Sequence, residues 1–295
     1  MTFHKIYDEI TKRFEVVSHT PSFFQGIKAI FIRNFKILWQ YKFTIVLNFA
    51  NTLIVSTLFY YIALLIPNMQ IEQNQYTVDS VSFIFAGFIL VDIATKILKK
   101  SLNSISSEMK QGTFETLSTL PFGLRKYFIS EVAFEMIYGF ITSILFFIPI
   151  FLIFPIFRTV SISFASSFSL LLVFFGVGLF FFSLSLLAAN FTILVKRGRE
   201  ISLVILSFLH LLSGSMFPLS VFPTWLKIIA YFSPFTLGVQ AFRLCLFGNG
   251  ILTDSIVWGA ILFLTLSSII IGVVFLLTYK RIYKRIRETG SIHEY

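Results

Sequence analysis

The sequence is poor in charged residues and nearly devoid of cysteine. Only 13% of its 295 residues are charged, whereas a soluble domain usually has about 25%. The one cysteine, Cys245, excludes an intrachain disulfide and a cysteine-based metal site. Hydrophobic residues make up 56% of the chain, 39 residues are Phe, and the mean hydropathy is +0.85. A soluble fold could not bury that much apolar surface, so we expect an all-α polytopic membrane protein.

Motifs for the common catalytic and metal chemistries are also missing. The chain has no G-x-x-x-x-G-K-[ST] phosphate loop, no H-E-x-x-H motif and no histidine cluster. His210 lies near Ser213 and Ser215, as an intramembrane serine protease would require, but the sequence has no G-x-S-x-G. A lone histidine in an apolar run is more often a core residue. We therefore expect no catalytic residues, no metal and no cofactor in this chain.

The basic residues are unevenly distributed, although the net charge of +10 would by itself be compatible with nucleic-acid binding. They lie between apolar blocks and not on one soluble face, which argues against a nucleic-acid partner. Of the 24 Lys and Arg residues, 21 fall in segments 1–42, 96–126, 196–199 and 280–287. Because positive charge marks cytoplasmic loops, these segments and both termini are expected on the cytoplasmic side of the cell membrane.

The apolar blocks predict one transmembrane domain over residues 1–295, with six spans. Residues 1–42 form a cytoplasmic tail and a basic, aromatic helix. That helix would lie along the membrane interface, or alternatively pack on a soluble domain as an ordinary helix. Residues 218–247 carry three prolines and form pieces too short to cross, as in a re-entrant hairpin. Residues 104–121 are expected to form a cytoplasmic helix and 280–295 a cytoplasmic tail. The expected spans are 43–66, 81–98, 127–157, 162–195, 201–217 and 256–279.

Three acidic residues fall near the inner ends of the expected spans. Asp92 lies four residues before Lys96, so a local ion pair competes with a functional role. Glu131 and Glu135 lie one helical turn apart. They are expected to face Arg125, Lys126 or lipid headgroups, with a proton or substrate role as the alternative.

Two stretches together resemble type-two ABC (ABC-2 type) exporter permeases. The first resembles the cytoplasmic E-x-x-x-G-T-x-E-x-L-x-x-x-P segment of that family, and the second its region between spans five and six. The first is carried by Glu108, Gly112, Thr113, Glu115, Leu117 and Pro121. The second is carried by Gly214, Phe217, Pro218, Pro223, Trp225, Pro234 and Arg243. The six-span plan is similar too, so the resemblance covers nearly the whole chain.

The resemblance implies a permease subunit that pairs with a second copy or a sister permease in the membrane lipid. A separate ABC ATPase subunit would bind ATP and Mg and hydrolyse the ATP. The segment around 108–120 would be the coupling helix that docks on this ATPase, and the hairpin would cap the pathway on the outer side. Substrates in the family include drugs, lipids and lipid-linked saccharides.

A different class remains open: an ion-coupled secondary transporter or another stand-alone integral membrane protein. A secondary transporter usually needs ionisable groups at mid-membrane, often on broken helices. The three acids of this chain instead lie near the inner ends of the expected spans, which favours the permease.

Overall fold

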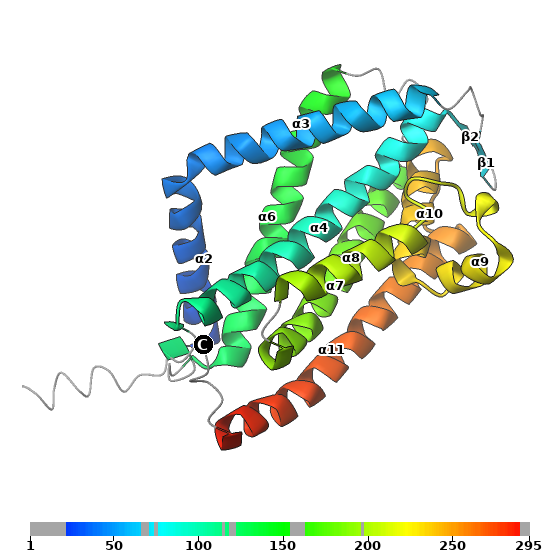
Figure 1. The fold of residues 1–295 in the computed structure, drawn as a ribbon. Coiled ribbons are helices and arrows are strands. Elements are labelled where there is room, and N and C mark those ends of the chain that lie inside the picture. Colours follow the sequence, from blue (N-terminus) through cyan, green and yellow to red (C-terminus); the bar gives the residue numbers. More distant parts are fainter. Residues whose placement is uncertain are drawn as a thin grey trace, which may run out of the picture.

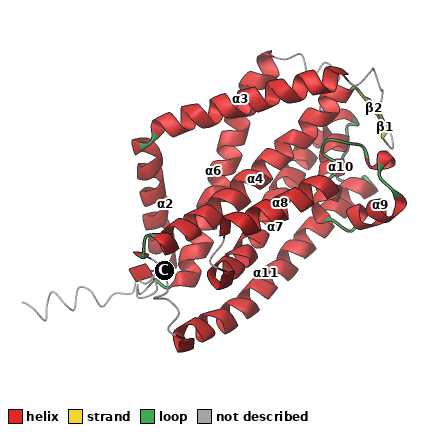
Figure 2. Ribbon diagram, in the orientation of Figure 1, coloured by secondary structure: helices red, strands yellow, loops and turns green. Residues whose placement is uncertain are grey.

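The structure is a computed structural model, and the residues that it describes are mostly helical, with short loops and one pair of short antiparallel strands (Figure 2). It describes residues 22–65, 71–73, 76–113, 116–117, 122–153, 163–195 and 198–289. The described helices are α2 (Phe23–Gln40), α3 (Lys42–Leu65), α4 (Ser80–Lys110), α6 (Leu124–Ile153), α7 (Phe164–Val195), α8 (Gly198–Leu212), α9 (Thr224–Tyr231), α10 (Pro234–Phe247) and α11 (Ser255–Thr289). The remaining elements are strands β1 (Ile71–Gln73) and β2 (Tyr76–Val78) and a short 3₁₀ turn, η1 (Leu219–Val221).

The axes of helices α4, α7, α8 and α11 are broadly aligned (Figure 1). The antiparallel β1–β2 hairpin, α9 and α10 gather at one end of this bundle. The end of α4, the start of α6 and helix α2 gather at the other end. We call the α2 end the inner end and the hairpin end the outer end, after the sides that the distribution of basic residues predicts for them.

Five described helices are long and apolar enough to cross a membrane, and the bent pair α9–α10 would make a sixth. The all-α polytopic class is therefore confirmed. α4 is the central helix, because 67% of its most apolar stretch is buried, whereas α3 buries only 11%. The buried side chains of α3 are the small residues Thr52, Ser56 and Ala63, so α3 approaches the bundle along one narrow stripe.

Helix α2 is amphipathic, as its sequence predicts. It begins in a capping box, in which the Ser22 hydroxyl accepts from Gln25 N and the Gln25 side chain accepts from Ser22 N. Its buried residues Gly26, Ile30 and Asn34 recur every four positions and define one face. The chain turns a sharp corner between α2 and α3 (Figure 1), which sets α2 across the inner end of the bundle.

Three helices end five residues or more away from the ends expected from the sequence. α11 continues to Thr289, ten residues past the expected end of the sixth span and into the expected tail. α4 continues without a break to Lys110, so no separate helix begins at residue 104. α8 stops at Leu212, five residues before the expected end of the fifth span. It stops there because Gly214 takes a left-handed backbone conformation with φ 64°. At 15 residues, α8 is about 22 Å long, short of the roughly 30 Å hydrocarbon core.

The proline-rich region folds as the two short helices that the sequence predicts. Pro223 precedes α9, and Pro234 is the first residue of α10. The two helices are bent by 84° at the break between them. α10 is almost wholly buried between α4, α7 and α11, whereas α9 lies at the surface. A bend of this size fits either a broken span or a re-entrant loop.

Candidate functional site

A polar cluster at the inner end of the bundle joins three helices that are distant in sequence. Its centre is Arg33 of α2, which donates hydrogen bonds to Glu108 at the end of α4 (3.3 Å) and to Glu131 of α6 (3.1 Å). Arg33 also donates to the Tyr127 hydroxyl (3.2 Å) and lies over its ring. One guanidinium therefore ties α2 to both α4 and α6.

Arg33 remains charged in this position. Burial lowers the pKa of its guanidinium, but the hydrogen bond to Tyr127 and the negative charges of Glu131 and Glu108 outweigh burial, and the net pKa is raised. Arg33 therefore supplies a fixed positive charge to the cluster.

Glu131 is the most deeply buried acid of the cluster, with a side chain only 3% exposed. Its carboxylate accepts from Arg33, from the Asn34 amide (2.9 Å) and from the Ser104 hydroxyl (2.6 Å). A buried charge is tolerated when it is paired and its remaining lone pairs are satisfied. The sequence-based expectation that Glu131 faces Arg125, Lys126 or headgroups was therefore wrong, because its partners come from α2 and α4.

Glu108 closes the other side of the cluster. Its carboxylate accepts hydrogen bonds from Arg33, from the Tyr127 hydroxyl (3.1 Å) and from the Thr113 hydroxyl. The Thr113 hydroxyl also lies 3.1 Å from the Glu108 carbonyl. Because Thr113 follows the turn at Gln111 and Gly112, this residue ties the start of segment 109–121 back to the end of α4.

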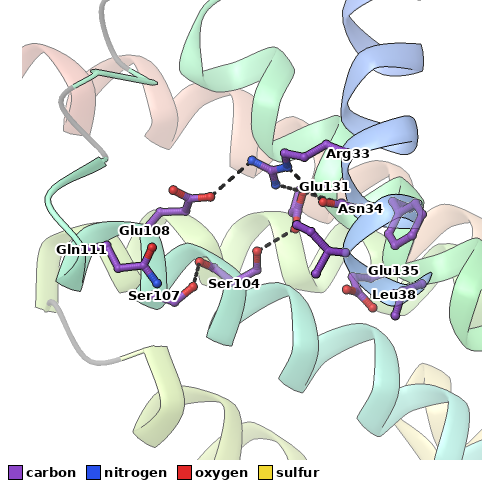
Figure 3. Close-up of a pocket in the computed structure, with 11 residues that line it drawn as sticks. Arg33, Asn34, Leu38, Ser104, Ser107, Glu108, Gln111, Glu131 and Glu135 are labelled. Atoms are coloured by element: carbon purple, nitrogen blue, oxygen red, sulfur yellow. Dashed lines mark hydrogen bonds and ion pairs between the residues drawn. The ribbon is translucent and has the colours of Figure 1, made fainter. Parts of the chain in front are cut away.

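A pocket of about 500 Å³ opens within this cluster (Figure 3). One part of its wall is polar and carries Arg33, Glu108, Glu131 and the buried carboxylate of Glu135. The other part is apolar and comes from Ile37, Leu38 and Phe134. The pocket thus offers charged and apolar surface side by side at the level of α2.

The segment after α4 is described only in part. Gly112 takes φ 70°, a conformation that favours glycine, and marks the turn that ends α4. Leu117 packs on the main core. Glu115 and Pro121, which the sequence also assigns to this segment, lie outside the described residues.

The far end of the segment also contacts α2. The Phe122 ring lies so close to Gly26 that any side chain there would collide with it, and the Lys126 ammonium lies 5.7 Å from the centre of the same ring. Helix α2 is thus tied to both ends of segment 109–121, through Arg33–Glu108 before it and Gly26–Phe122 after it.

The third expected acid, Asp92, forms the local ion pair that the sequence predicts. Its carboxylate lies 2.6 Å from the Lys96 ammonium. Ser143 of α6 donates to Asp92 (2.8 Å) and accepts from Lys96 (3.1 Å). The pair therefore joins α4 to α6 and lies apart from the Arg33 cluster.

The expected hairpin residues do not converge on one pocket. Phe217 and Trp225 are exposed, at 58% and 64%, while Pro218 and Pro223 bracket η1. Arg243, in contrast, is only 1% exposed and is enclosed by backbone carbonyl groups. The hairpin residues thus divide into surface positions and one buried cation.

Sequence reasoning missed Arg33, Asn34, Ser104 and Tyr127. Arg33 counted only among the basic residues of segment 1–42. The one available signal was the position of Asn34, which shares a helical face with Ile30 and Gly26 and is polar where an apolar residue would be expected. That signal marks a buried polar contact without naming its partner.

The helical fold, the five or six candidate spans and the inner polar cluster together define a multi-pass membrane protein. A comparison with family models gives a match to the ABC-2 type transporter family over residues 25–247. The match spans α2 through α10, including the Arg33 cluster and the hairpin. The chain therefore belongs to the ABC-2 type transporter family and is a permease, the transport component of an ABC transporter. A search of curated proteins gives no match.

Proposed function

We propose that this chain is the membrane-spanning subunit of an ATP-driven exporter in the cell membrane. A separate ABC ATPase, which binds ATP and Mg, would dock on segment 108–121. A second permease, either a copy of this chain or a sister chain, would complete the pathway, and both termini would be cytoplasmic. The observation that carries this proposal is the double attachment of α2 to the ends of segment 109–121.

Force on that segment has a defined mechanical route. The Arg33–Glu108 contact precedes the segment and the Gly26–Phe122 contact follows it. Displacement of the segment would therefore displace α2, and α3 follows α2 after one residue. Since α3 contacts the bundle along a narrow stripe of small residues, it could move with α2 at little cost in packing.

An amphipathic substrate suits the inner pocket. Its polar part would face the charged wall and its apolar part would face Ile37, Leu38 and Phe134. A drug, a lipid or a lipid-linked saccharide would meet this description. The ion-coupled alternative is less well supported, because Asp92 and Glu131 are held in ion pairs with Lys96 and Arg33.

Site-specific photo-crosslinking tests the docking site. A benzophenone amino acid would replace Thr116, which is exposed in the segment, or, as a control, Lys280, which is exposed on α11. We expect the Thr116 position to crosslink, in intact cells, to a protein with a G-x-x-x-x-G-K-[ST] sequence, and the Lys280 position to do so far less. Crosslinking to no ATP-binding protein, or equally from both positions, would contradict the docking assignment.

A steric substitution tests the mechanical route. Gly26→Leu would push α2 away from Phe122, whereas Ala29→Leu adds the same bulk to an exposed position of the same helix. In the purified complex, Gly26→Leu should leave the ATPase bound but abolish the effect of the permease on ATP hydrolysis. Ala29→Leu should behave like the parent, and equal behaviour of the two variants would refute the route.

A further inference from the structure

The outer end of the bundle carries a small body with its own apolar core. We call residues 212–232, which include η1 and α9, the outer cap. Leu212, Leu219 and Ala230 are buried together, with Phe222 and Leu226 packed on them. This cluster is separate from the main core, which contains residues of α10 such as Phe235 and Val239. The outer cap therefore packs chiefly on itself.

Arg243 of α10 joins the outer cap to the bundle. It donates to the Gly214 carbonyl (2.9 Å) and the Ser215 carbonyl (2.7 Å) in the cap, and twice to the Phe83 carbonyl of α4 (3.0 and 3.3 Å). Its guanidinium also stacks on the Phe83 ring at 3.5 Å. These charge-assisted bonds reach the carbonyls just past the end of α8, where a cation is favoured.

Gly87 permits this arrangement. A side chain at this position would collide with the Ser215 carbonyl and would lie 2.8 Å from an Arg243 nitrogen. The cap turn therefore rests directly on the backbone of α4. The Thr236 hydroxyl of α10 adds a second polar contact to the cap, because it donates to the Leu212 carbonyl at 3.0 Å.

The cap and the bundle have separate apolar cores joined by polar contacts, and such an arrangement allows the cap to move relative to the bundle. An interdigitated core must lose many contacts at once to open, whereas a few hydrogen bonds can break and exchange partners with water. The cap keeps its own core intact when these bonds break. It can therefore swing as a unit about its connections to α8 and α10.

We propose that Arg243 and Gly87 form a latch that holds the outer cap closed on α4, and that outward opening of the pathway requires its release. Arg243 acts as a positioning residue, because it orients the cap and does not itself meet the substrate. The claim that the latch is released when the pathway opens rests on the proposed transport function. The first part, the latch itself, concerns this chain alone.

A thiol at Ser215 reports on the latch. The Ser215 side chain is 1% exposed, and its hydroxyl has no hydrogen-bond partner among the described residues, so cysteine replaces it with little disturbance. The reporter chain carries Ser215→Cys and Cys245→Ala, and the rate of reaction with a polar maleimide is measured in mild detergent. Arg243→Lys or Gly87→Ala is then added, with Lys227→Ala as a control cation on the cap. A parallel chain keeps Cys245, which is fully buried in the main core.

With the latch weakened, we expect the Ser215 thiol to react about tenfold faster, the factor for loss of one charged hydrogen bond. Cys245 should stay protected, and Lys227→Ala should match the parent. Unchanged Ser215 labelling would overturn the latch. Labelling of both sites would overturn it too, because Arg243 would then support the whole core.

Release during transport is tested in the complex with its ATPase. Trapping with ATP and vanadate should speed labelling of the reporter chain. An unchanged labelling rate would show that the cap stays attached to α4 during transport, and it would overturn the proposed release. If no ATPase copurifies, the transport proposal fails, while the labelling results in detergent still decide whether the latch exists.

Discussion

Replacing Arg33 with alanine should destabilise the inner end of the bundle. R33A leaves the Glu131 carboxylate buried without its cation, and it removes the bond from α2 to Glu108. Removing one partner of a fully buried ion pair typically costs about 3–5 kcal/mol. Here the Arg33 side chain is 37% exposed, which admits water and weakens the pair.

Glu131 also keeps its bonds from Asn34 and Ser104 in this variant. We therefore expect a loss of about 1–3 kcal/mol in the free energy of unfolding, or roughly 3–10 °C in unfolding temperature. Adding Glu131→Gln removes the stranded charge but keeps the shape of the side chain. The double variant should regain much of the loss, because contacting residues are not additive.

Thermal unfolding in detergent, followed by intrinsic fluorescence, measures these differences. Lys36→Ala is the matched control, because it removes an exposed cation from the same helix. An unfolding temperature for R33A equal to that of Lys36→Ala would refute the reasoning. A double variant no more stable than R33A would refute the assignment of the loss to the buried Glu131 charge.

Two further substitutions test other contacts in the bundle. Lys96→Met should lower the unfolding temperature, because it leaves the Asp92 carboxylate without its cation, and adding Asp92→Asn should restore that temperature. Equal unfolding temperatures of the parent and Lys96→Met would argue that the pair contributes nothing to stability. Gly178→Ala should cost about 1–3 kcal/mol, because the new methyl would collide with the Phe140 ring between α6 and α7. Gly259→Ala, where a methyl meets open space in α11, should be neutral or stabilising, and the same thermal scan would expose any reversal of this order.

The spans and the hairpin could be read from the sequence because their signals are local. Apolar runs set α3, α7 and the start of α11 to within a few residues of the structure. Pro223 and Pro234 fixed the starts of α9 and α10, since proline lacks a donor and suits only the first turn of a helix. The Asp92–Lys96 pair was also visible, because its two partners lie one turn apart on the same helix.

The sequence also contains a helical pattern that predicts the continuation of α4 to Lys110, but polar residues within that stretch obscured it. Leu102, Ile105 and Met109 recur at helical spacing and are buried. Ser104, Ser106 and Ser107 lie between them, and this polarity suggested a separate cytoplasmic element. No glycine or proline interrupts the stretch before Gly112.

The inner cluster could not be read from the sequence, because its contacts are long-range. Arg33 and Glu131 are 98 positions apart, and nothing near either residue specifies the other. Burial of Glu131 follows only once α2 is laid across α4 and α6. The same reason applies to Arg243. The sequence assigns it to the hairpin, but it does not reveal that Arg243 donates a hydrogen bond to Phe83 of α4, 160 positions away.

Copurification of ATPase activity tests the central claim most directly. The tagged chain would be isolated in mild detergent from the cells that express it and assayed for vanadate-sensitive ATP hydrolysis. A variant in which residues 108–120 are replaced by a flexible linker of the same length provides the comparison. The account predicts ATPase activity with the native chain and its loss with the variant. No ATPase activity with the native chain, or equal activity with both chains, would contradict it.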